Sequence, residues 1–242
     1  MDRIAPTKRP DRVSIGTQKW RDLLFLHWPV EVAALRRLIP AGLEIDTFED
    51  SAWVGVVPFA MHEIRTALMP RSLALDFLET NVRTYVHHGG EAPGVYFFSL
   101  DASSRLAVHA ARLSFGLPYH YAEMSLRKDG GTIDYALRRR SRRAPRLDVR
   151  YSRGETLGPS PPGTRDHFFL ERYYLYVERA GVLLRGQVHH PAYPRETATV
   201  HALEEDLVAA SGLPKTSGAP IVHYASGVDV EIFGLELCGR AR

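Results

Sequence analysis

The sequence predicts a mainly β protein, of the α+β class, that carries a few short helices. Short runs rich in β-branched and aromatic residues recur along the chain, and glycine-containing turns separate pairs of them. Only two or three segments show the spacing of apolar residues that is typical of helices. The chain has 242 residues, of which 45% are apolar and 24% charged. Since β-rich folds of this size often stay undivided, we expect one domain built on antiparallel strands.

The first half of the chain alternates between predicted strands and short helices. Residues 20–28 are mostly apolar and aromatic, which predicts a buried strand. Pro29 then begins a short helix that Pro40 and Gly42 end, because Val32, Leu35 and Leu38 recur at a helical spacing. Further strands are expected over 52–64, 79–88 and 94–101. A second helix is expected over 103–115, capped by Ser103 or Ser104, with one side formed by Leu106, His109, Ala110 and Leu113.

The second half is predicted to consist of hairpins. Residues 122–128 and 132–140 flank the turn Asp129-Gly130-Gly131, and residues 171–178 and 182–189 flank Ala180-Gly181. A short helix over 203–210 and closing strands over 221–226 and 228–237 follow. The proline-rich stretch 159–163 is too short for a domain boundary and predicts a surface loop.

Composition narrows the class of protein. The net charge of +3 is small beside 31 basic and 28 acidic side chains, so the pI of 9.0 does not indicate a polycation that binds nucleic acid. Cys238 is the only cysteine, which excludes an internal disulfide and favours a cytoplasmic location. No run approaches the roughly 18 apolar residues that span a bilayer, and the polar segment 1–19 predicts a flexible N-terminal arm.

Several motifs resemble a known family. The segments LRRLIPAGLEID (35–46) and RLSFGLPYH (112–120) resemble the acetoacetate decarboxylase superfamily. More closely, the chain resembles the DUF2071 (YqjF-like) family of uncharacterised bacterial proteins, whose pattern matches WVGVVPF (53–59), NVRTY (81–85) and GVYFFSLD (94–101). The resemblance covers 20–242 and implies one acetoacetate decarboxylase-like domain, an antiparallel β-barrel or cone with a few short helices.

The resemblance also implies a changed reaction centre. The decarboxylase forms a Schiff base on a lysine that has a second lysine beside it. An alignment on Arg112 and Pro118 without a gap places Tyr119 and His120 at these two positions, and neither side chain forms a Schiff base. Lysine is scarce throughout, since Lys8, Lys19, Lys128 and Lys215 are the only four. We therefore do not expect decarboxylation through an imine.

Other positions of the implied pocket are partly retained. Arg21 aligns with the arginine that faces the substrate carboxylate in the superfamily, and Glu79 aligns with an acidic residue of a Tyr-x-Glu strand. Phe77 replaces the tyrosine of that motif, and a second family glutamate falls near Gly55 or Val56 and is lost. An ion pair of Arg21 with Glu79 or Asp22 is the alternative role for this arginine.

Each candidate has a structural alternative. Tyr119 would stabilise an oxyanion or else pack with its hydroxyl on the backbone. His120 would move a proton, although consecutive strand residues point to opposite faces, which separates it from Tyr119. Glu79, Asn81, Arg83 and Tyr85 share one strand face. Amphipathicity alone places that face in solvent, whereas the resemblance favours a polar cavity in which Asn81 and Arg83 bind substrate.

Other kinds of site have little support in the sequence. The eleven histidines form no zinc motif, so we expect no metal, and the absence of nucleotide-binding motifs predicts no cofactor. The basic run 138–143 has no interleaved aromatic residues, and we expect a solvated loop and no nucleic-acid or membrane partner.

Two hypotheses about function remain. The first is an enzyme that acts on a small oxo-acid or carbonyl compound by enolisation, hydration or C–C cleavage, with Arg21 on the carboxylate, Glu79 or His120 moving the proton and Tyr119 on the oxyanion. The second is a non-catalytic binder of a small carboxylate or carbonyl compound. The sequence leaves open whether the chain forms a homo-oligomer.

Overall fold

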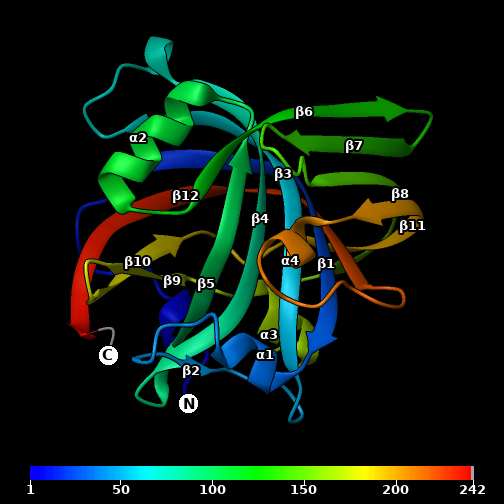
Figure 1. Ribbon diagram of the computed structural model, residues 1–242. Helices are drawn as coiled ribbons and strands as arrows, with labels where there is room; N and C mark the ends of the chain where they lie inside the picture. Colours follow the sequence, from blue (N-terminus) through cyan, green and yellow to red (C-terminus); the bar gives the residue numbers. More distant parts are fainter. Residues whose placement is uncertain (241–242) are drawn as a thin grey trace.

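The computed structural model describes residues 1–240 and is built mainly from long strands with short helices between them (Figure 1). The strands are β1 (Gly16–Val30), β2 (Glu44–Ile45), β3 (Ala52–Thr66), β4 (Leu75–His88), β5 (Glu91–Ala102), β6 (Tyr119–Asp129), β7 (Thr132–Arg139), β8 (Arg146–Gly158), β9 (Tyr174–Arg179), β10 (Val182–His189), β11 (Arg195–Glu205) and β12 (Ile221–Arg240). The helices are α1 (Val32–Arg36), α2 (Arg105–Phe115), α3 (Arg165–Leu170) and α4 (Leu207–Ala210), with 3-10 turns η1 (Ala5–Thr7) and η2 (Arg71–Leu73). The mainly β class is confirmed.

Within residues 1–240 the strands close into two rings that share a wall. Strands β12, β1, β3, β4, β5, β9 and β10 pair in that order, and β10 pairs again with β12, which closes what we call the small barrel. Strands β6, β7, β8 and β11 connect β5 to β12 on the other side and close the large ring. The shared wall is therefore covered on both faces, and both faces must be apolar or internally hydrogen-bonded.

Alternation along β4 divides its side chains between the two rings. Val82 and Val86 pack into one cluster with β6, β7 and β8, inside the large ring. Tyr85 packs into the other cluster with α3, inside the small barrel. Glu79, Asn81 and Arg83 have the same parity as Tyr85 and are 3%, 5% and 8% exposed. The solvent position that amphipathicity predicted for this face is wrong, because the small barrel covers it.

A bulge in β1 changes which side chains face the small barrel. Trp20, Leu23 and Phe25 all pack in the small-barrel cluster. In a regular strand, residues 20 and 23 would point to opposite faces. The pairing of β1 with β3 shifts between Arg21 and Leu26, and Asp22 has a φ of 55°. One extra residue at this point turns the strand and reverses the alternation, as β-bulges do.

Helices close both ends of the small barrel. Phe168 and Phe169 of α3 pack in its core, and Arg83 Nη2 and Tyr85 Oη donate to the Phe169 carbonyl over 3.1 Å each. At the other end α2 packs through Val108 against Leu100 and Tyr119. Figure 1 shows these two helices at opposite ends of the long strands β4 and β5.

Most predicted strands and helices are found, with different bounds. The strands over 20–28, 52–64, 79–88 and 94–101, the helix after Pro29 and both hairpins are confirmed as β1, β3, β4, β5, α1, β6–β7 and β9–β10. The two closing strands form one strand, β12, which passes through Gly227 without interruption. Strands β2, β8 and β11 and helix α3 were not predicted.

Two helix predictions need correction. Ser104 caps α2 by accepting from the Ala107 amide over 3.3 Å. The side assigned to Leu106 and Leu113 is the exposed one, at 64% and 77%, and Ala107 and Val108 are buried instead. The helix expected over 203–210 is α4 alone, since 203–205 end β11, where pairing with β8 outweighs the local helical pattern.

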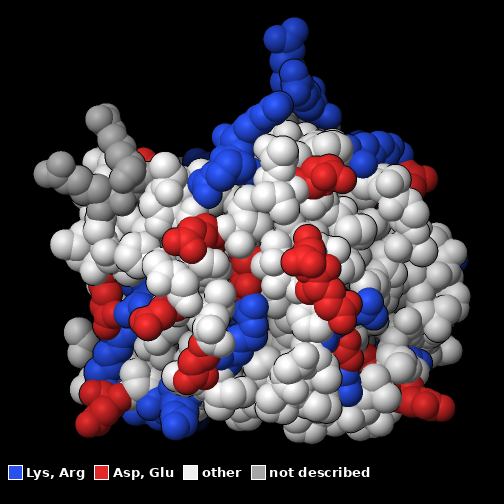
Figure 2. Space-filling view, turned by 90° about the horizontal axis from the view of Figure 1, so that it is seen from below, with Lys and Arg blue, Asp and Glu red and all other residues white. Residues whose placement is uncertain are grey.

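The N-terminal segment contacts the body of the protein. The boundary expected after Lys19 falls inside β1, which begins at Gly16. Arg3 Nη1 lies 2.5 Å from Asp46, and Arg9 pairs with Glu231 over 2.7 Å. Acidic and basic side chains are interspersed on the face shown in Figure 2, in keeping with the small net charge. No helix in the described part of the chain could cross a membrane.

Candidate functional site

The candidate site lies inside the small barrel and begins with Glu79 of β4. This strand is rich in threonine, valine and aromatic residues, which favour extended backbone, and it pairs with β3 and β5 on its two sides. Glu79 is opposite Phe59 of β3, so its carboxyl group points into the small barrel. Burial raises the pKa of Glu79 from 4.5 to about 7, against the opposing effect of a hydrogen bond from Tyr119.

Tyr119 is the direct partner of Glu79. The Tyr119 hydroxyl donates to Glu79 Oε2 over 2.7 Å, and both side chains are buried. Tyr119 reaches this position because β6 begins beside Leu100 of β5, in parallel pairing, directly after α2. Burial raises the pKa of the Tyr119 phenol, and the charge of Glu79 raises it further. The phenol therefore stays protonated as a donor next to a carboxyl group that titrates near neutrality.

Arg83 supplies a buried positive charge in the same barrel. Its guanidinium lies 5.6 Å from the Phe25 ring and 5.8 Å from the Tyr85 ring. Nη2 donates to the Phe169 carbonyl, whereas Nε has no hydrogen-bond partner in the described part of the chain. Within residues 1–240, no carboxylate forms an ion pair with Arg83. A buried cation without a counter-ion is costly, and an anionic ligand would offset that cost.

Further buried polar atoms on this side of the sheet lack partners. Among residues 1–240, neither Asn81 Oδ1 nor His190 Nε2 has a hydrogen-bond partner. The His190 Nδ1–H is placed to donate to the Pro191 carbonyl over 2.8 Å, which leaves Nε2 as an acceptor. Burial lowers the pKa of His190 to about 4, so the ring is neutral at physiological pH. Buried polar atoms almost always have a protein, water or ligand partner, so these atoms favour a small polar ligand or ordered water.

His27 lies beside Gly55, one of the two positions near which the family acid was expected. Its ring stacks on Phe169 with centroids 4.0 Å apart, and its Nε2 lies 2.6 Å from the Tyr85 hydroxyl. A Cβ atom at Gly55 would lie 3.1 Å from the His27 ring. A longer side chain at Gly55 would displace that ring. The sequence analysis did not select His27 or His190. His27 could have been found, because residues two apart on a strand share a face and Phe25 is a core residue.

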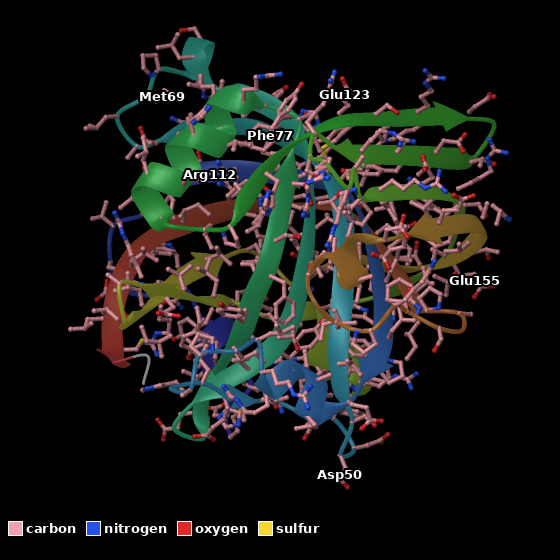
Figure 3. The ribbon with its side chains drawn as sticks, in the orientation of Figure 1. Asp50, Met69, Phe77, Arg112, Glu123 and Glu155 are labelled. Carbon is pink, nitrogen blue, oxygen red and sulfur yellow. The ribbon has the colours of Figure 1, made fainter. Side chains whose placement is uncertain are left out.

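His120 lies apart from Tyr119. As consecutive strand residues, the two side chains point to opposite faces of β6, and His120 lines an outer pocket beside α2 together with Arg112. Burial and the charge of Arg139 lower the pKa of His120. Figure 3 marks Arg112 on the α2 side of the molecule and Phe77 near the barrel wall. The structure thus brings Glu79 and Tyr119 together but does not bring His120 to them.

Arg21 also lies away from Glu79 and Tyr119. Its guanidinium donates to the carbonyls of Trp20 and Val228 over 2.8 Å each and pairs with Asp229. In the described part of the chain it forms no ion pair with Glu79 or Asp22. Arg21 pairs with Ala60 of β3, whereas Glu79 pairs with the preceding residue, Phe59. The side chain of Arg21 therefore points to the opposite face of the sheet, immediately before the bulge at Asp22. The alignment without a gap could not account for this local reversal of alternation.

Residues 1–240 contain no cluster of three or more His, Cys, Asp and Glu side chains that could hold a metal ion.

The side chains of the basic run 138–143 lie in different environments. Arg139 is buried and pairs with Asp101 over 2.7 Å, Arg140 pairs with Glu123, and Arg142 and Arg143 are exposed.

Comparison with known proteins identifies the family. The family model of DUF2071, described as an uncharacterized conserved protein, matches residues 17–229. The chain belongs to the DUF2071 family. The uncharacterized protein YqjF of Bacillus subtilis (strain 168), a relative of this DUF2071 protein, is 37% identical over 222 residues, which cover 91% of each chain.

Solved structures resemble this DUF2071 protein in fold. The enduracididine biosynthesis enzyme MppR complexed with pyruvate has a TM-score of 0.66 at 12% identity and covers 97% of this chain and 95% of its own. Acetoacetate decarboxylase has a TM-score of 0.65 at 15% identity and covers 95% and 91%. The acetoacetate decarboxylase-like fold is confirmed by these neighbours, and at such low identity they show the fold alone.

Proposed function

We propose that this DUF2071 protein binds a small oxo-acid inside the small barrel and catalyses proton transfer at the carbon beside its carbonyl group. The observation that carries the proposal is the buried pair of Glu79 and Tyr119, joined by a 2.7 Å hydrogen bond. A carboxyl group whose pKa lies at about 7 can both accept and release a proton at neutral pH.

The roles follow from the chemistry of each group. Arg83, a buried cation without a protein counter-ion, would hold the carboxylate of the oxo-acid. The Glu79 carboxylate would take the proton from the carbon, the C–H electron pair would form the C=C bond of the enolate, and the π pair of the C=O bond would move to the oxygen. The Tyr119 hydroxyl, whose one proton is donated to Glu79 in the free protein, would turn to donate to the enolate oxygen. Once the proton on Glu79 has exchanged with solvent, its return to the carbon restores the oxo-acid, so no oxidant or cofactor is required.

Asn81 lies between Glu79 and Arg83 on one face of β4. Successive residues on one face of a strand are about 7 Å apart, so Glu79 and Arg83 are separated by two such steps. The long side chain of Arg83 would therefore extend along the barrel toward Glu79 to hold the carboxylate of a ligand there. Asn81 would line the space between them. Its Oδ1 has no protein partner and could accept from a hydrated or protonated ligand. The MppR neighbour is complexed with pyruvate, which makes pyruvate the first compound to test.

A proton NMR experiment with pyruvate in deuterated water tests this proposal. We expect the wild-type protein to accelerate deuterium exchange of the methyl protons. The Glu79→Gln variant should lose that acceleration by at least about 100-fold, the usual range for a general acid–base group. Glu123→Gln, an exposed carboxylate on β6, is the matched control and should exchange at the wild-type rate.

The same experiment separates catalysis from simple binding. Saturable line broadening of pyruvate without exchange would reject the catalytic role and support the non-catalytic binder. Absence of both exchange and broadening at millimolar pyruvate would reject an oxo-acid of this size as the ligand.

A further inference from the structure

A second polar site lies outside the small barrel, between α2 and the β6–β7 hairpin. A pocket of about 200 Å³ opens there, lined by six basic side chains: Arg105, His109, Arg112, His120, Arg139 and Arg140. These residues come from α2, β6 and the end of β7, which are separate in the sequence. In Figure 3, Arg112 is marked on α2 and Glu123 on β6, near this region.

The charges in this pocket are only partly neutralised. Asp101 pairs with Arg139 through two 2.7 Å hydrogen bonds, and Glu123 pairs with Arg140. Within residues 1–240, Arg105 and Arg112 form no ion pair. Two arginines therefore remain uncompensated, beside two histidines.

The geometry of these two arginines leaves donors available. Arg112 Nε donates to the Tyr119 carbonyl over 2.7 Å, and Nη2 contacts the same oxygen, so this side chain is held in place while Nη1 stays unused. The Arg105 guanidinium lies over the Tyr121 ring, 4.3 Å from its centroid. A guanidinium fixed by a carbonyl or an aromatic face is ordered before a ligand binds, which lowers the entropic cost of binding.

We infer that this pocket binds the phosphate group of a small phosphomonoester. Guanidinium groups that approach from several directions match a tetrahedral dianion with three acceptor oxygens better than a planar monocarboxylate. The volume is below the 300–1,000 Å³ that is usual for sites enclosing larger ligands. The pocket would therefore hold a phosphate group and leave the remainder of the molecule outside.

This site is distinct from the proposed reaction site. Neither Glu79 nor Tyr119 lines the outer pocket, and the buried Tyr119 hydroxyl is directed to Glu79. The inference does not depend on proton transfer at Glu79. Binding at the outer pocket and exchange in the barrel can be measured separately, and failure of one leaves the other testable.

Isothermal titration with methyl phosphate and with inorganic phosphate, at low and moderate salt, tests the inference. We expect saturable binding of methyl phosphate at one site per chain. Arg105→Gln should weaken binding by at least about tenfold, because it removes a charge-assisted contact to the phosphate group. Arg143→Gln removes the same charge from an exposed residue outside the pocket and should bind as the wild type does. Circular dichroism of both variants checks that the fold is retained.

Each other result would overturn the inference. Absence of saturable binding would reject the site. Equal weakening by Arg105→Gln and Arg143→Gln would show a diffuse charge effect in place of a pocket. Binding to vesicles that contain phosphatidic acid, with no binding of methyl phosphate, would assign these arginines to a membrane surface and reject the small-molecule site.

Discussion

At the scale of single residues, the proposed proton transfer depends on a carboxyl group buried beside a phenol. Glu79 is buried with Tyr119 as its hydrogen-bond donor, and burial is the main cause of its raised pKa. The family resemblance selected both residues, and the pairing of β4 with β3 is regular from Glu79 to Thr84, so alternation along β4 predicts the face of Glu79 correctly. Arg21 could not be placed in the same way, since the bulge at Asp22 reverses the alternation of β1.

The Glu79→Gln variant should change how stability depends on pH. A carboxyl group with a raised pKa in the folded protein contributes its full stabilisation below the pKa of the unfolded chain and loses it as the pH rises through the folded value. The pKa of Glu79 rises from 4.5 to about 7, which corresponds to roughly 3 kcal/mol. We expect the free energy of unfolding of the wild type, relative to Glu79→Gln, to fall by about this amount between pH 4.5 and pH 8, as measured by urea denaturation. A difference that stays constant over this range would show that Glu79 titrates normally.

Removing the Tyr119 hydroxyl should raise the pKa of Glu79 further. The hydrogen bond from Tyr119 stabilises the charged carboxylate and lowers that pKa, so Tyr119→Phe leaves burial unopposed by this bond. We also expect a loss of about 1 kcal/mol in the free energy of unfolding at neutral pH. Carbon NMR titration of labelled glutamate measures the pKa. A lower value in the variant would contradict the hydrogen bond.

At the scale of helices and strands, local sequence patterns predicted which segments form a helix or hairpin better than they predicted which side of a helix is buried. The two glycine turns predicted the β6–β7 and β9–β10 hairpins, because a positive φ at Gly130, Gly131 and Gly181 suits tight turns. The buried side of α2 was not predictable, since the helix packs through its small residues Ala107 and Val108 and leaves its leucines exposed. Tertiary contacts with β5 and β6, absent from the local sequence, decide that orientation.

Strand β12 requires a glycine at position 227, where it pairs with Arg21 of β1. Gly227 has a φ of 148°, and a Cβ atom there would lie 2.3 Å from the Trp20 carbonyl oxygen. We expect Gly227→Ala to lower the free energy of unfolding by at least about 2 kcal/mol, from backbone strain and overpacking together. Gly234→Ala is the control on the same strand, because no atom lies within 4 Å of its Cβ position. Equal stability of the two variants in thermal denaturation would contradict the close approach of β12 and β1.

At the scale of the whole molecule, the shared wall between two rings creates the polar interior. β4 presents Glu79, Asn81 and Arg83 to the small barrel and valines to the large ring, so both faces of one strand are buried. The sequence shows that alternation but not what covers each face. Closure of the small barrel requires the pairing of β10 with β12 and of β5 with β9, contacts between distant segments that no local pattern encodes.

A crystal structure of the protein soaked with pyruvate would test whether the small barrel is an oxo-acid site. We expect the pyruvate carboxylate to contact the Arg83 guanidinium and the carbonyl oxygen to lie within hydrogen-bond distance of the Tyr119 hydroxyl. The methyl carbon should face Glu79. Pyruvate bound elsewhere, or a small barrel that stays free of ligand at saturating pyruvate, would contradict the claim that this barrel binds an oxo-acid.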